Sequence, residues 1–183
     1  MQRDVMWQRL DMPGLEHLQL IADNDGVGVG SVLIGVVDNA PLSLRYQIYC
    51  NAKWQVLGVN VQTFEHKGLS LQADGEGHWT TGSGSTIDFL DGCIDADISI
   101  TPFTNTLSIK RLNLQHGETA EIAVAYIELP ALSVQPSMQR YTCLDARRYR
   151  FESLATGYTA DLTVDEDGLV IEYPDLWKRV WEK

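Results

Sequence analysis

The sequence predicts an all-β protein built from a strongly curved antiparallel sheet. Short segments alternate with a period of two: Leu69 to Ala73 alternates apolar with polar residues, and in Glu121 to Leu129 the residues Ile122, Val124 and Tyr126 alternate with Ala123, Ala125 and Ile127. Turns rich in Asp and Gly, such as Asp23 to Gly26 and Asp165 to Gly168, separate these segments. No helical pattern of ordinary length lies between two strands, which disfavours parallel βαβ units.

The predicted strands follow one another along the whole chain. We expect them at 5–10, 15–21, 27–37, 42–50, 54–63, 69–73, 94–100, 107–114, 121–129, 138–144, 148–153, 158–164 and 169–173. Only 175–183 shows a helical pattern, with Trp177 and Trp181 four residues apart and Pro174 before the start. So many strands must curl to limit exposed edges, which predicts a barrel, half-barrel or roll with a short C-terminal helix.

The length of 183 residues suits a single domain, 1–183, or two related β halves that share one core. A weak echo between Trp7-Gln8-Arg9 and Met138-Gln139-Arg140 leaves an internal duplication open. No apolar run approaches the ~18–20 residues that cross a bilayer, so we expect no stable membrane insertion. Asp4 and Arg9 interrupt the apolar segment that a secretory signal would need, so a cytoplasmic location is expected.

The charge balance constrains the partners. The chain carries 14 basic and 25 acidic residues, for a formal net charge of -11. This charge opposes binding to nucleic acid and to anionic membrane surfaces, and it suits a neutral or weakly charged ligand. The cysteines, Cys50, Cys93 and Cys143, are widely spaced within strand-like sequence, which indicates buried reduced thiols.

No motif demands a cofactor or a metal. In Gly26 to Gly30 the third glycine is misplaced for a dinucleotide loop, and the sequence that follows is strand-like and not helical. Asp165 to Gly168 lacks most of the oxygen ligands of a calcium loop and is expected to be a hairpin turn. The four histidines are scattered without metal-ligand spacing. We therefore expect no cofactor and no metal site.

The segment from 94 to 114 contains the most informative charges. In a strand, Ile94, Ala96 and Ile98 share one face, and Asp95 and Asp97 lie on the other, which we expect to be solvated. Further on, an unbroken strand would place Arg111 in phase with Leu107 and Ile109, on the apolar side, where it needs an anion or a ligand head group. A β-bulge that shifts the register is the alternative.

The same segment carries a family resemblance. The runs Leu90 to Asp95, Thr101 to Leu107 and Ile109 to Leu112 resemble the signature of the Putative glycolipid-binding family, a bacterial group long classed as a domain of unknown function. Other landmarks of that family are matched in order along nearly the whole chain: Arg9-Leu10-Asp11, Pro13 to His17, Leu44-Arg45-Tyr46, Trp54, Gly77-His78-Trp79, Tyr126, Leu129-Pro130, Gln139 to Thr142 and Asp167 to Val170. The resemblance implies a spiral β-roll similar to bacterial lipoprotein carriers.

The resemblance implies a binding protein without catalysis, which holds a glycolipid or another amphipathic lipid in an apolar interior. The residues expected to contact this ligand are Arg111, Asn105, Thr101, Tyr46, Trp54, Tyr126 and Tyr141. Two alternatives stay open. An enzyme acting on a sugar-like or lipid-like substrate would need two of Glu16, Asp91 and Asp95 in one cleft. An interaction protein would show a filled core and an exposed apolar patch.

Overall fold

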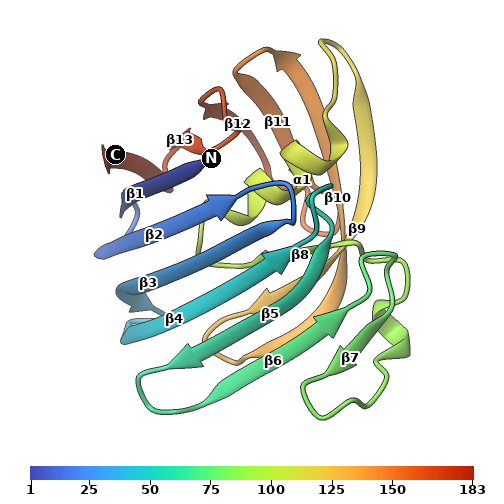
Figure 1. Cartoon of the computed structure of the whole chain (residues 1–183). Coiled ribbons are helices and arrows are strands. Elements are labelled where there is room, and N and C mark those ends of the chain that lie inside the picture. Colours follow the sequence, from blue (N-terminus) through green and yellow to red (C-terminus); the bar gives the residue numbers. More distant parts are fainter.

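A computed structural model describes residues 1–183 as one open, curved sheet of 14 strands, which confirms the predicted fold class (Figure 1). The first seven strands are β1 (Gln2–Arg9), β2 (Gly14–Ala22), β3 (Val27–Val37), β4 (Ala40–Cys50), β5 (Val56–Thr63), β6 (Gly68–Ala73) and β7 (Trp79–Thr81). The others are β8 (Asp95–Ile98), β9 (Thr119–Glu128), β10 (Ser133–Asp145), β11 (Arg148–Ser153), β12 (Thr159–Val164), β13 (Val170–Tyr173) and β14 (Trp177–Glu182).

The sheet has its two chain ends at its centre. Strands β1 to β7 run outward in one direction, and β14 back to β8 run outward in the other, so β1 pairs with β14. Neighbouring strands are antiparallel except β8 and β9, which are parallel. A parallel pair needs a long crossover connection, and the helix α1 (Thr104–Leu112) lies within that connection.

The helix α1 occupies part of the segment that the sequence suggested was a basic strand, so neither the unbroken strand nor the β-bulge is correct. Pro102 lies just before the helix, and Asn113 ends it in the left-handed conformation, with φ 46° and its N–H bonded to the Ile109 carbonyl. Lys110 and Arg111 fall in its last turn. The residues from Thr104 to Ile109 are all buried, so the helix shows no solvent-facing stripe in its first two turns.

The predicted C-terminal helix is also wrong, because residues 177–182 form strand β14. This strand pairs with β1 on one side and with β13 on the other. A helix here would leave the backbone groups of both neighbours unpaired, and a helix this short gains little stability on its own. The hydrogen-bonding demand of the sheet therefore decides the conformation.

The inside of the curve is filled. A core of 39 buried residues includes Trp7, Tyr46, Trp79, Phe103 and Tyr141, and Figure 1 shows α1 within the curve of the sheet. The three cysteine thiols are buried and unpaired with one another, as the sequence indicated. No helix has the length and apolar character that crossing a membrane requires.

Candidate ligand-binding site

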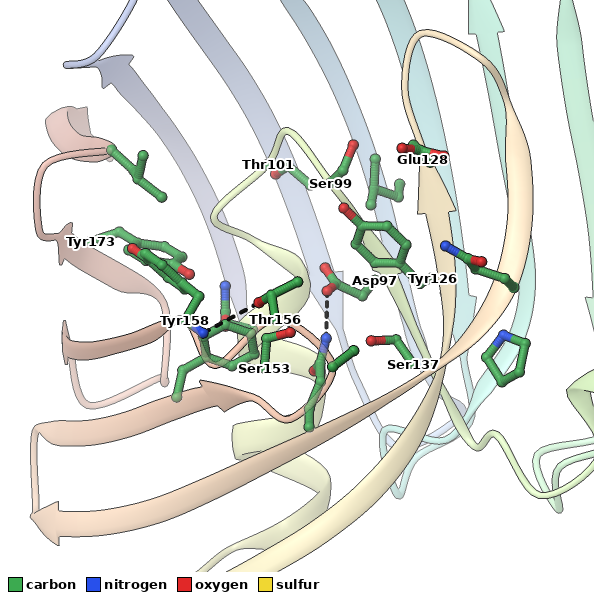
Figure 2. Close-up of a pocket in the computed structure, with 18 of the residues that line it drawn as sticks. Asp97, Ser99, Thr101, Tyr126, Glu128, Ser137, Ser153, Thr156, Tyr158 and Tyr173 are labelled. Carbon is green, nitrogen blue, oxygen red and sulfur yellow. Dashed lines mark hydrogen bonds between the residues drawn. The ribbon is translucent and has the colours of Figure 1, made fainter.

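A pocket of about 530 Å³ opens where the second half of the sheet meets the segment around α1 (Figure 2). Its size falls within the ~300–1,000 Å³ of typical small-molecule sites. The lining consists of Asp97, Ile98, Ser99, Thr101, Asn105, Tyr126, Glu128, Gln135, Pro136, Ser137, Gln139, Phe151, Ser153, Ala155, Thr156, Tyr158, Tyr173, Leu176 and Trp177. Figure 2 shows Asp97 in the middle of this lining, with Tyr126 on one side and Tyr158 and Tyr173 on the other.

Asp97 is held in the pocket by two neutral donors. The Thr104 hydroxyl, at the first residue of α1, donates to Asp97 Oδ1 at 2.7 Å, and the Gln139 amide donates to Oδ2 at 2.6 Å. Burial raises the pKa of Asp97, and the charge of Asp95 adds to this effect, while the two hydrogen bonds oppose it. The carboxyl therefore lies in a polar wall without an ionic partner among these contacts.

Aromatic rings form another part of the lining and its support. Phe151 lies 5.5 Å from Tyr141 and 6.4 Å from Tyr173 between ring centroids, and Tyr158 lies 6.4 Å from Tyr173. These spacings are those of packed aromatic clusters, which are rigid because each ring has few rotatable bonds. The cluster supplies flat apolar surfaces beside the hydroxyl and amide groups.

Glu16 lies behind the pocket, connected to it by Thr101. Its Oε1 accepts hydrogen bonds from the hydroxyls of Tyr46, Ser31 at 2.8 Å and Thr101 at 2.9 Å. Its Oε2 is buried without a hydrogen-bond partner in the protein. Burial raises the pKa of the Glu16 carboxyl to about 7, although the three hydroxyl hydrogen bonds act in the opposite direction.

Asp95 and Arg111 form an ion pair beside the pocket. Arg111 Nε donates to Asp95 Oδ1 at 2.6 Å, and its terminal nitrogen donates to Oδ2 at 2.8 Å. Ser108 also donates to Oδ2, at 2.9 Å. The expected solvated face of this strand is therefore wrong for Asp95, which is completely buried. The helix places its own cation, Arg111, against that carboxylate, whereas the predicted strand left Arg111 to find an anion or a ligand head group.

The structure brings three of the seven predicted ligand residues to the pocket wall: Thr101, Asn105 and Tyr126. Tyr141 lies behind the wall and donates to the Asn105 side chain at 3.0 Å. Tyr46 lies 3.1 Å from the Thr101 hydroxyl. Arg111 and Trp54 do not line the pocket, and the Trp54 ring faces the Lys110 ammonium at 5.6 Å. Ligand contact by any of the seven stays a prediction.

The carboxylates proposed for an enzyme do not meet in this pocket. Glu16, Asp91 and Asp95 are all absent from its lining, and Asp91 lies exposed after the short 3-10 turn at Asp88–Leu90. No group of three or more His, Cys, Asp or Glu side chains lies close enough to hold a metal ion. The Asp165 to Gly168 segment is the turn between β12 and β13, as predicted.

Comparison with known proteins identifies the family. The model of the family described as "Putative glycolipid-binding" matches residues 4–179. The chain belongs to this family. The crystal structure of a DUF1089 family protein from Pseudomonas aeruginosa is similar to this chain, with a TM-score of 0.81 and 39% sequence identity. The match covers 90% of this chain and 92% of that chain, and no curated protein matches.

In this member of the Putative glycolipid-binding family, the sequence reasoning missed much of the pocket. Asp97, Gln139, Tyr158, Tyr173 and Trp177 all line it and were not predicted as ligand residues. Gln139 lies within the Gln139 to Thr142 landmark of the resemblance, which was a usable signal. Tyr158 follows a turn sequence and Tyr173 precedes one, and neither carried a comparable signal. Strands β13 and β8 lie far apart in the strand order, so only the curvature of the sheet brings their residues to one pocket.

Proposed function

We propose that this protein binds the polar head of a glycolipid in the pocket around Asp97. The observation that carries the proposal is the mixed lining, in which hydroxyls and amides alternate with Tyr, Phe and Trp rings. Sugars match such a surface because their hydroxyls form hydrogen bonds while their C–H faces lie against aromatic rings. The family description supports the same ligand class.

In the proposed binding mode the head group lies in the pocket, whereas the sequence-based prediction placed the acyl chain inside the roll. The interior is occupied by the core of 39 buried residues, whereas the pocket wall mixes polar and apolar side chains. A tail would instead leave the pocket along its apolar rim residues, which include Pro136, Ala155 and Leu176. Burial of each methylene there contributes up to about 0.8 kcal/mol, so the tail adds affinity while the head determines specificity.

Calorimetric titration with octyl β-glucoside and with octanoate tests the proposal. We expect the glycoside to bind and octanoate, whose head is a carboxylate in place of a sugar, to bind at least about tenfold more weakly, since it lacks the hydroxyls that the lining recognises. Tyr158→Ala should weaken glycoside binding by about 1–2 kcal/mol through loss of an aromatic surface.

Tyr49→Ala is the matched control for Tyr158→Ala. Tyr158 is 41% exposed and Tyr49 is 46% exposed, and Tyr49 does not line the pocket. The control variant should bind the glycoside like the wild-type chain. Equal affinity for octanoate and the glycoside, or no binding of either, would contradict head-group recognition.

A second candidate function is protein interaction through the outer apolar patch, defined as Leu15, Val32, Ile34 and Phe64. Leu15 pairs with Ile34 across β2 and β3, and Phe64 bonds to Ser43, the partner of Ile34 on β4. Phe64 is 84% exposed. Contiguous exposed apolar side chains are typical of interaction surfaces, and the filled core fits this alternative too.

A further inference from the structure

The pocket has an uneven charge. Of its 19 lining residues, Asp97 and Glu128 are acidic, and none is Lys, Arg or His. The whole chain carries 14 basic residues, so the absence of a cation from this wall is a property of the site. Glu128 lies at an exposed position, where it accepts a hydrogen bond from the Ser133 hydroxyl at 3.1 Å.

Two arginines close to the pocket, Arg111 and Arg9, each form an ion pair with another carboxylate. Arg111, on the helix that also holds Asp97, forms its two hydrogen bonds with Asp95. Arg9 lies 6.0 Å from the ring of Trp177, a lining residue, but its guanidinium is bound to Asp11 at 2.7 and 2.9 Å. Asp97 therefore has no counter-charge within the protein, in contrast to its neighbour Asp95.

Asp97 retains the capacity to bind a further donor. Each of its oxygens accepts one hydrogen bond, from Thr104 or from Gln139, whereas an ionised carboxylate accepts about four in all. A carboxylate removed from water is costly unless a cation or several donors accompany it. A positively charged group in the pocket would supply both the missing charge and the missing hydrogen bonds.

We propose that the head group bound in this pocket is cationic, and that an amino sugar with its ammonium group against Asp97 is the preferred ligand class. The inference rests on the proposed binding of a sugar head in the same pocket. It also implies that the site discriminates against anionic heads, such as uronic acids and phosphorylated sugars, because no lining cation would receive them.

Three octyl glycosides with the same tail test the inference. The probes are octyl β-glucoside, octyl 2-amino-2-deoxy-β-glucoside and octyl β-glucuronide, titrated calorimetrically at a pH slightly below neutral, where the amine is protonated. We expect the amino glycoside to bind at least about tenfold more tightly than the neutral one, and the glucuronide to bind more weakly than both.

Asp97→Asn identifies the group responsible. The variant should lose the preference for the amine, so that its ratio of affinities for the amino and the neutral glycoside falls from at least about ten to about one. Asp25→Asn is the control, because it makes the same change in net charge at an exposed turn outside the pocket. Asp25→Asn should keep the preference for the amine. If Asp97→Asn fails to fold, the comparison of the three glycosides with the wild-type chain still tests the proposal.

The outcomes separate this inference from the proposed function. Binding of the neutral glycoside with an equal or weaker affinity for the amine overturns the cationic head group and leaves sugar-head binding intact. Binding of none of the three glycosides overturns both. A preference for the amine that survives in folded Asp97→Asn overturns the assignment to Asp97.

Discussion

Glu16 is a carboxylic acid held inside the sheet by three hydroxyl groups and no cation. Its pKa of about 7 lies above the ordinary 4.5, so the folded state retains the proton better than the unfolded state. The resulting stability is fully present below the unfolded pKa and is lost as the pH rises through about 7. The loss amounts to about 3 kcal/mol, taken from the size of the shift.

Glu16→Gln should remove this pH dependence. The amide oxygen can accept the same three hydroxyl hydrogen bonds, and the amide nitrogen takes the place of Oε2, which has no partner. Urea unfolding at several pH values from 4.5 to 7 should therefore show the variant gaining free energy of unfolding relative to the wild-type chain as the pH rises. Glu65→Gln, at an exposed turn, is the control. Parallel curves for wild type and Glu16→Gln would contradict the assignment.

Residue chemistry was partly readable from the sequence. Thr101, Asn105 and Tyr126 were predicted as ligand residues and line the pocket. Arg111 was recognised as a cation that needs an anion or a ligand head group if it lies on the apolar side, and Asp95 supplies an anion. The identity of the partner was not readable, because it depends on the helix, which turns Arg111 and Ser108 toward the same carboxylate.

At the scale of elements, an ion pair between Arg111 of α1 and Asp95 of β8 joins the helix to the sheet. Arg111→Met should lower the free energy of unfolding by about 3–5 kcal/mol, because it leaves the completely buried Asp95 without a counter-ion. The matched control is Arg150→Met, whose pair with Asp161 is exposed and should contribute less than about 1 kcal/mol. Chemical unfolding measures both changes.

The same ion pair allows a compensating variant. Asp95→Asn combined with Arg111→Met removes the unpaired charge and should recover part of the lost stability. Equal losses for Arg111→Met and Arg150→Met would show that the buried pair contributes no more than a surface pair.

Strands were readable as elements and helices were not. Strands 27–37 and 148–153 have the predicted bounds, because alternation along a half-buried strand is a local pattern. α1 was mistaken for a strand because it is buried on most sides and its Leu107, Ile109 and Arg111 also fit a period of two. The sequence did contain helix signals, namely Pro102, the basic last turn and Asn113, and the folded chain follows these signals and not the alternation.

At the scale of the whole molecule, the outer apolar patch predicts self-association. We expect sedimentation velocity at rising concentration to show a dimer, and Ile34→Ser to weaken it at least about tenfold by removing a central apolar contact. Ile21→Ser is the control, because Ile21 is 57% exposed against 60% for Ile34 but pairs with Gln2 and Gly28, away from the patch. A monomer at every concentration would contradict this function of the patch.

The order of the strands was not readable from the sequence. Local turns predict that neighbours in sequence pair as antiparallel hairpins, and most do. Two pairings differ from this expectation: β1 and β14 come from opposite ends of the chain, and β8 and β9 are parallel. The predicted duplication of two β halves stays a prediction. The pocket depends on this order, since its wall combines β8 to β11 with β13 and β14.

The sequence by itself determined the all-β class, most strand positions, the turns and the family, because side-chain alternation, turn chemistry and family motifs are local along the chain. The tertiary structure decided that 104–112 is helical, that 177–182 completes the centre of the sheet and that Asp97 lacks a cation. These features depend on which backbone and charged groups become partners across the fold, and a buried group must satisfy its hydrogen bonds and charge wherever the fold places it.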